Sequence, residues 1–144
     1  MLHFAATATP IVSNFRQSHH TWREGAKLVH ISSARPPVGS VFSFMLNEHA
    51  RAAFTFTQRV SGRRVHGRCV AASSANRSAP SCKRTVVRGT LSFAAHAGAN
   101  SVAFQGRLSS TRKLSAGVYQ LTIVATSVTR QRSAPKTLGF TIAR

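Results

Sequence analysis

Two cysteines are the residues of this chain whose type and spacing most directly indicate chemistry. Cys69 and Cys82 are separated by a segment of small and polar residues, 70–81, which is typical of a loop. A disulfide between them would close a loop of about fourteen residues, stabilise the fold by about 3 kcal/mol and place the protein outside the reducing cytosol. Two alternatives stay open. One is a zinc site that includes His66, which lacks a paired CxxC motif and a fourth ligand. The other is a pair of unrelated buried thiols.

Carboxylates, which most hydrolytic mechanisms require, are almost absent. Glu24 and Glu48 are the only acidic side chains among 144 residues, whereas hydrolysis needs two placed carboxylates or a serine–histidine pair oriented by one. His49 adjoins Glu48, but neighbouring residues of a strand point to opposite faces. His19 and His20 form a contiguous pair that in a loop is usually a surface feature, and no glycine-rich loop leads into a helix. We therefore predict a protein that is not an enzyme, without catalytic residues, metal or cofactor.

Positive charge is the most unusual bulk property. Twenty Lys and Arg residues against two acidic residues give a formal net charge of +18. Such a chain attracts polyanions through release of counterions, so nucleic acids, teichoic-acid-like polymers and anionic lipid headgroups are all admissible partners. The cations are scattered without long runs, which is also typical of a generally solvated basic surface. Six arginines would cluster if the strand that ends at Arg59 lay beside the segment near Arg84: Arg59, Arg63, Arg64, Arg68, Arg84 and Arg88.

Short runs of alternating apolar and polar residues occupy the chain from residue 39 onward. Phe42, Phe44 and Leu46 share one face of an extended segment, and Phe54 and Phe56 share one face of the next. No helical periodicity competes with this pattern, and many short strands with turns between them indicate a β-sandwich or barrel. The alternation predicts six strands, at 41–46, 52–57, 87–93, 102–104, 119–125 and 138–142, with turn residues at 61–64, 97–100, 115–117 and 133–135.

Residues 1–38 differ from residues 39–144, which we interpret as the sandwich domain. The segment from Ile11 to Phe15 is expected to pair at a sheet edge, with an irregular connection following at 26–37. Trp22 is expected to anchor this N-terminal segment on the sandwich. The sequence contains no run of eighteen apolar residues, the length needed to span a bilayer. Its first residues also lack the basic and apolar regions of a recognisable signal peptide.

A composite motif runs through the second half of the chain. Its parts are Ser-Gly-Arg-Arg-Val-His-Gly-Arg-Cys-Val at 61–70, Cys-Lys-Arg at 82–84, Gly-Thr-Leu at 89–91, Ala-Gly-Ala-Asn at 97–100, Gly-Arg at 106–107 and Leu-Ser-Ala-Gly-Val-Tyr at 114–119. The motif resembles an Ig-like or fibronectin-III-like module of exported proteins of high-GC Gram-positive bacteria, a family of largely unassigned function. The resemblance implies an antiparallel β-sandwich of about seven strands with Cys69 and Cys82 bridged. It also implies export and supplies no catalytic residues.

Some details of the motif concern local structure. The segment 114–119 also resembles a tyrosine corner, in which the phenol of Tyr119 bonds the backbone just upstream. The chain departs from the module at 127–131, where an Asp and a Gly-Asn turn are common, so a tight turn is not predicted there. His66 stands where a second glycine is usual.

Two classes of function follow from these observations. The first is a structural, adhesive or spacer module of a secreted or cell-surface bacterial protein. Its partners would be other domains of an exported parent protein or anionic polymers of the cell envelope. The alternative is a basic β-domain that binds nucleic acid through the six arginines named above. Because the aromatic residues alternate into the predicted core, few remain to stack on bases, and this favours the first function.

Overall fold

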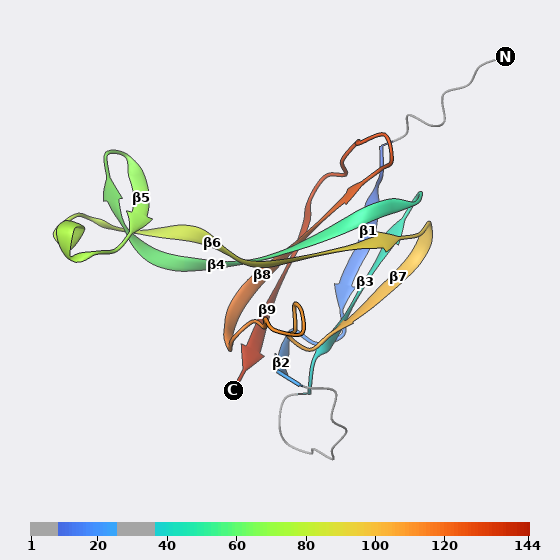
Figure 1. The fold of residues 1–144 in the computed structure, drawn as a ribbon, viewed down its shortest axis with the longest axis horizontal. Coiled ribbons are helices and arrows are strands. Elements are labelled where there is room, and N and C mark those ends of the chain that lie inside the picture. Colours follow the sequence, from blue (N-terminus) through green and yellow to red (C-terminus); the bar gives the residue numbers. More distant parts are fainter. Residues whose placement is uncertain (1–8, 26–36) are drawn as a thin grey trace.

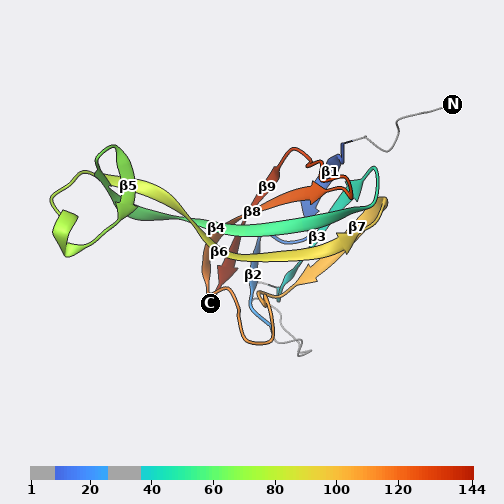
Figure 2. The same ribbon diagram turned by 45° about the horizontal axis from the view of Figure 1, so that its top comes forward.

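The computed structural model describes residues 9–25 and 37–144, whose strands form two sheets packed face to face (Figures 1 and 2). The smaller sheet has the order β1-β3-β7, with β1 Val12–Gln17, β3 Ser40–Leu46 and β7 Gly98–Phe104. The larger sheet has the order β2-β9-β8-β4-β5, and β6 pairs along the other edge of β4. Its strands are β2 Thr21–Arg23, β4 Ala50–Val65, β5 Arg68–Ala71, β6 Ser81–Ala95, β8 Gly117–Thr126 and β9 Lys136–Ala143. The predicted all-β sandwich is confirmed.

Helical structure in the described ranges is limited to one 3-10 turn, η2 Ser74–Asn76. No helix there is long and apolar enough to cross a membrane. Neighbouring strands are antiparallel except β2 and β9, which are parallel. The described part of the chain therefore forms its backbone hydrogen bonds mainly between strands, and its side-chain pattern must be interpreted with a period of two.

The core between the sheets is built from the aromatic side chains that the alternation identifies. Phe42, Phe44 and Leu46 of β3 and Phe54 and Phe56 of β4 are all buried. Phe54 packs edge-on against Phe42 and Phe44, with ring centroids 5.9 and 6.2 Å apart. Burying one such side chain contributes about 1.5–3 kcal/mol, so this cluster supplies much of the stability of the sandwich.

Trp22 holds the N-terminal segment on the sandwich. It lies in β2, opposite Ile142 of β9, and its side chain is fully buried. The indole is stacked on Phe140, with centroids 5.4 Å apart, and lies edge-on to Phe104 at 5.8 Å. β1 forms the edge of the smaller sheet, as expected for the leading strand. The predicted irregular connection at 26–37 lies, apart from Pro37, outside the described residues.

All six strands predicted from residue 39 onward are present, but the prediction of a turn at 61–64 is wrong. These residues continue β4, which runs to Val65, and β6 already begins at Ser81. Val60 lies opposite Arg84, so the two strands satisfy each other's backbone groups although few of their side chains are apolar. The predicted turn at 97–100 is shortened because β7 begins at Gly98.

Two strands, β2 and β5, were not predicted, and the described ranges contain nine strands where about seven were expected. These two strands have three and four residues. An alternating pattern cannot be recognised over so few positions. Their pairing is therefore determined by neighbouring strands, β9 and β4, rather than by a local sequence signal.

Candidate polyanion-binding arm

β4 and β6 continue beyond the sandwich as a paired ribbon that carries β5 and η2 at its far end (Figures 1 and 2). We call this projecting part, residues 57–88, the arm. Inside the sandwich β4 lies between β8 and β6, whereas at the far end of the arm, from Gly62 to Val65, it lies beside β5. Since its strands pair with one another, backbone hydrogen bonds hold the arm together without an aromatic core.

A β-bulge marks the root of the arm. Phe56 pairs with Gly89 and Thr57 pairs with Val87, so Arg88 is an extra residue of β6 without a partner position on β4. A bulge of this kind bends the strand and increases its twist. The ribbon therefore changes direction where it leaves the sandwich.

The side chains of β4 explain why the ribbon leaves the sandwich at this point. Phe56 is the last aromatic residue on the core-facing side, and Gln58 takes the next position. Nε2 of Gln58 donates to the carbonyl oxygen of Val118 at 3.1 Å, and its Oε1 accepts from Nε of Arg88 at 2.9 Å. These bonds close the edge of the core. Beyond them, Val60 is the one apolar residue on this side of β4, so little apolar surface needs to be covered.

A two-residue turn joins β4 to β5 at the tip of the arm. His66 and Gly67 have φ values of +52° and +77°, and a type I′ hairpin turn requires positive φ at both central residues. Histidine is one of the non-glycine residues that adopt this conformation more often than most. Such a position favours glycine, because a side chain is strained at positive φ.

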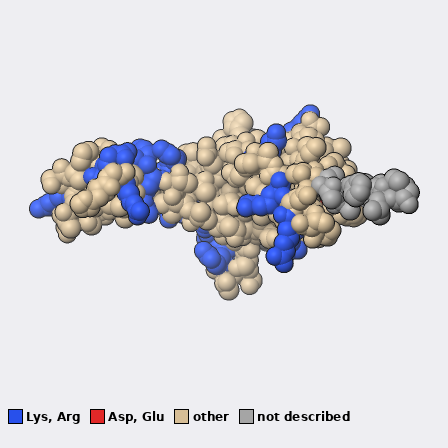
Figure 3. All heavy atoms as spheres, turned by 90° about the horizontal axis from the view of Figure 1, so that it is seen from above, with Lys and Arg blue, Asp and Glu red and all other residues tan. Residues whose placement is uncertain are grey.

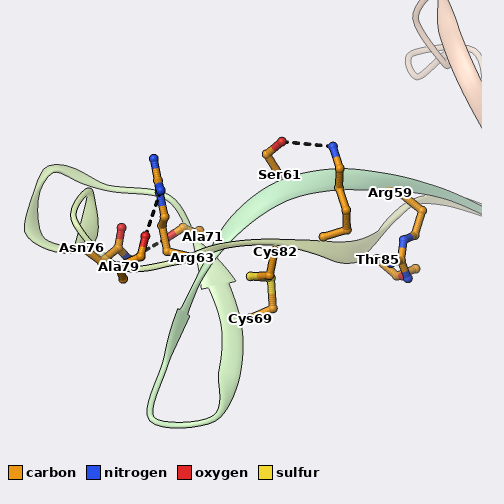
Figure 4. The surroundings of a disulfide bond; sticks show 10 residues. Arg59, Ser61, Arg63, Cys69, Ala71, Asn76, Ala79, Cys82 and Thr85 are labelled. Carbon is orange, nitrogen blue, oxygen red and sulfur yellow. Dashed lines mark hydrogen bonds between the residues drawn. A yellow bond between two sulfur atoms is a disulfide. The ribbon is translucent and has the colours of Figure 1, made fainter.

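A disulfide joins β5 to β6 across β4 (Figure 4). Cys69 lies opposite Arg64 and Cys82 lies opposite Gly62, and the Cα atoms of the cysteines are 6.0 Å apart. A Cβ atom added to Gly62 would lie 3.0 Å from Sγ of Cys69 and 2.4 Å from the carbonyl oxygen of Val70. Glycine is therefore required beneath the bridge, because no larger residue leaves room for it.

The loop between the cysteines is fastened by side-chain hydrogen bonds. Oδ1 of Asn76 accepts from the amide of Ser73 at 2.9 Å, and Nδ2 of Asn76 donates to the carbonyl oxygen of Ala71 at 3.0 Å. Nη1 of Arg63 donates to the carbonyl oxygen of Ala79 at 2.9 Å (Figure 4). The loop is thus tied to β4 by an arginine and closed at its base by the disulfide.

Positive charge is concentrated on the arm. Eight of the twenty Lys and Arg residues lie in it, and neither acidic residue does. Figure 3 shows Lys and Arg side chains gathered over the arm on the face in view, with no acidic side chain visible beside them. The electrostatic field of the arm is therefore uncompensated by neighbouring carboxylates. The eight residues are Arg59, Arg63, Arg64, Arg68, Arg77, Lys83, Arg84 and Arg88.

Four of these cations, including Arg88 through its bond to Gln58 described above, form hydrogen bonds within the arm. Nζ of Lys83 donates to Oγ of Ser61 at 3.2 Å, and Nη1 of Arg59 lies 3.4 Å from Oγ1 of Thr85. Arg63 donates to the loop as described above. Ser61 and Arg63 lie on one side of β4, and the disulfide lies on the other (Figure 4). The side away from the disulfide thus uses part of its charge for internal hydrogen bonds.

The disulfide side carries cations whose hydrogen-bonding groups are unused. Arg64 lies opposite Cys69 and Arg84 lies opposite Val60, which places both on the same face as Gly62. In the described part of the chain, neither guanidinium has a hydrogen-bond or ion-pair partner. A guanidinium with free N–H groups can bind a phosphate or a carboxylate through two parallel hydrogen bonds.

The six arginines predicted as polyanion contacts all lie in the arm. Their clustering follows from the pairing of β4 with β6, which places Arg59 opposite Thr85. Two further cations, Lys83 and Arg77, lie in the same arm and were not predicted. Lys83 precedes Arg84 directly, so the sequence contained a signal for it. Arg77 is brought to the surface by the cysteine loop, for which spacing gives no signal.

The remaining predicted residues lie away from the tip of the arm or have other partners. The hydroxyl of Tyr119 donates to the carbonyl oxygen of Ser115 at 2.7 Å, which is the bond of a tyrosine corner. Both cysteines are in the disulfide, so neither thiolate is free to form a zinc site with His66. Glu24 lies 3.6 Å from Nζ of Lys113. The described residues contain no group of three His, Cys, Asp or Glu side chains that could hold a metal.

Aromatic side chains are absent from the arm. Six phenylalanines, the tryptophan and the tyrosine are buried in the core, and Phe15 and Phe93 are partly buried against it. Proteins that bind single strands of nucleic acid stack bases on exposed aromatic rings. The arm has no residue for this purpose, although its arginines could contact a phosphate backbone.

No protein-family model matches the chain, and no curated protein is similar to it at a significant level. A function must therefore be inferred from the residues of this chain.

Proposed function

We propose that the protein is an Ig-like module of a secreted or cell-surface bacterial protein and that its arm binds an anionic polymer of the cell envelope. The observation that carries the proposal is the arm, a projecting ribbon with eight cations and no acidic residue. Its role is adhesion or positioning of the parent protein rather than catalysis, since the chain has only two carboxylate side chains.

The strand order supports the Ig-like assignment. With β2 and β5 set aside, β1, β3 and β7 correspond to strands A, B and E, and β9, β8, β4 and β6 correspond to strands G, F, C and C′. Ig-type sandwiches place these two groups of strands in opposite sheets. Tyr119 lies near the start of β8, the strand that carries the tyrosine corner in such sandwiches. The arm is then an extended C–C′ hairpin.

The position of the disulfide supports export. Disulfides persist in oxidising compartments and are rare in the cytosol. The bridge between Cys69 and Cys82 holds β5 and the cysteine loop in a region without an aromatic core. There the covalent link supplies stability that buried apolar area supplies in the sandwich. Such a device is useful where cysteines stay oxidised, at the cell surface or outside the cell.

The chemistry of the arm favours a phosphate-bearing envelope polymer as the partner. Arginines bind phosphate groups in pairs of hydrogen bonds, and each phosphate neutralised releases counterions. A polymer of repeating phosphodiesters offers many such groups along an extended chain. Nucleic acid offers phosphates as well, but the arm has no aromatic ring to distinguish bases by stacking. Recognition is thus expected to depend on charge and spacing rather than on bases.

The test measures binding of the full chain to purified poly(glycerol phosphate) at several salt concentrations. The arm variant combines Arg64→Gln with Arg84→Gln, and the matched control combines Arg130→Gln with Arg132→Gln, which lie between β8 and β9. We expect the arm variant to weaken binding about tenfold or more and to reduce the slope of log K against log salt by about 1.5. The control removes the same charge outside the arm and should weaken binding much less.

Two outcomes would overturn this proposal. Equal weakening in both variants would mean that net charge acts without a defined site. Tight and sequence-selective binding to duplex or single-stranded nucleic acid at physiological salt, measured in parallel, would support the nucleic-acid function instead.

A further inference from the structure

A cleft of about 340 Å³ lies at the root of the arm. We call it the root cleft. One wall is β6 at residues 87–90, and the other wall is formed by Leu108, Ser109 and Arg112, which belong to the connection between β7 and β8. It is separate from the tip of the arm, where the disulfide lies, and its lining contains no acidic residue. Its position gives a bound polymer a concave contact beside the exposed ribbon.

The two walls are held together by close packing at Gly89. A Cβ atom added to this residue would lie 2.4 Å from Cδ1 of Leu108. The turn that follows is closed by hydrogen bonds. The amide of Leu108 donates to the carbonyl oxygen of Arg112 at 2.9 Å, and Oγ of Ser109 accepts from the amides of Thr111 and Arg112 at 3.2 and 3.1 Å. The backbone that carries Arg112 is therefore fixed relative to β6.

Arg88 belongs to the opposite wall, β6, and a hydrogen bond fixes its side chain. It is the extra residue of the bulge, and its Nε donates to Oε1 of Gln58 at 2.9 Å. This bond leaves the two terminal nitrogens of its guanidinium without a partner among the described residues, and the guanidinium of Arg112 has no partner there either. Because Gln58 is on the same face of β4 as Arg64, the guanidinium of Arg88 lies on the disulfide side of the arm.

We propose that the root cleft binds a single phosphate group through Arg88 and Arg112, with the hydroxyl of Ser109 as a further donor. Two guanidinium groups and one hydroxyl match the charge and the several acceptor oxygens of a phosphate. The proposal rests on the proposed function for the source of the phosphate, which is one repeat of the envelope polymer. The polymer then runs from the unpaired arginines of the disulfide side to the root cleft, where one repeat is held in a fixed position.

The first experiment titrates the full chain with inorganic phosphate and follows backbone amide resonances. We expect saturable shifts at Gly89, Thr90 and Ser109 that a chloride titration at equal ionic strength does not produce. Arg112→Gln should raise the dissociation constant for phosphate about tenfold, the effect of one lost charge-assisted hydrogen-bonding group. Arg107→Gln is the matched control, since it lies in the same connection outside the root cleft, and it should change the constant less than about twofold.

Either of two results would overturn the proposed phosphate site. One is phosphate binding that is unchanged in Arg112→Gln, and the other is a set of amide shifts distributed over the arm without saturation at the cleft. A second experiment separates this from the proposed function. The variant with Arg64→Gln and Arg84→Gln should lose affinity for poly(glycerol phosphate) and retain its affinity for inorganic phosphate. Phosphate binding without any polymer binding would support the cleft and contradict the envelope polymer. Polymer binding without phosphate-induced shifts at the cleft residues would support the envelope polymer and contradict the phosphate site.

Discussion

The two halves of β4 form the same kind of backbone ladder and have opposite side-chain environments. From Ala50 to Phe56 the core-facing positions are buried, whereas most positions from Arg59 onward are at least partly exposed. Both halves pair with β6 along one edge. Strand formation therefore does not require a core at every position, provided that the backbone groups are paired. What differs is how each half is stabilised, by aromatic packing in the sandwich and by a disulfide in the arm.

The largest expected effect comes from removing an aromatic side chain in the sandwich half. Phe54 is fully buried, and its ring lies 5.2 Å from that of Phe93 and 5.9 Å from that of Phe42. We expect Phe54→Ala to lower the free energy of unfolding by about 3–5 kcal/mol, measured by urea denaturation, because it leaves a cavity. Arg59→Ala, on the same strand in the arm, should change it by less than about 0.5 kcal/mol. Similar losses in both variants would contradict the conclusion that the two halves of β4 are stabilised in different ways.

The next effect concerns the disulfide. We expect Cys69→Ser with Cys82→Ser to lower the local stability of the arm by up to about 3 kcal/mol, the contribution of closing a loop of this length. Amide hydrogen exchange at Arg63 and Val70 should accelerate up to about a hundredfold, while exchange at Phe54 stays unchanged. The wild-type chain after reduction is the control and should behave like the variant. Equal acceleration in the sandwich would show that the arm and sandwich unfold as one unit.

The same difference determines how much of the fold could be predicted from the sequence. The strands of the sandwich were predictable because Phe42, Phe44, Phe54 and Phe56 alternate where a core must be covered. The arm covers no such core, so Ser61 and Gly62 indicated a turn where the structure has a strand. Their effect on local conformation is weaker than the pairing of β4 with β6, which depends on contacts distant in sequence.

The candidate site was predictable to the extent that it depends on neighbouring positions along two strands. Six arginines could be assigned to one cluster once β4 and β6 were assumed to be adjacent. Arg112 of the root cleft could not, because its place depends on the fit of Leu108 against Gly89, two residues far apart in the chain. Glycines that permit close contact between distant segments carry no signal of their partner.

The smallest effect tests how the sandwich fastens a connection without a covalent link. The hydroxyl of Tyr119 holds the carbonyl of Ser115, while its ring stacks on Phe140 with centroids 5.5 Å apart. Tyr119→Phe keeps the ring and removes one hydrogen bond, so we expect a loss of about 1 kcal/mol in urea denaturation. Thr137→Val removes the exposed hydrogen bond to Thr122, 3.2 Å long, and should cost less, because water replaces it. If the two losses are equal, the corner adds nothing beyond an ordinary surface hydrogen bond. A larger loss at Tyr119 means that one partly buried hydrogen bond fastens this connection to the sandwich, as the disulfide fastens the loop of the arm.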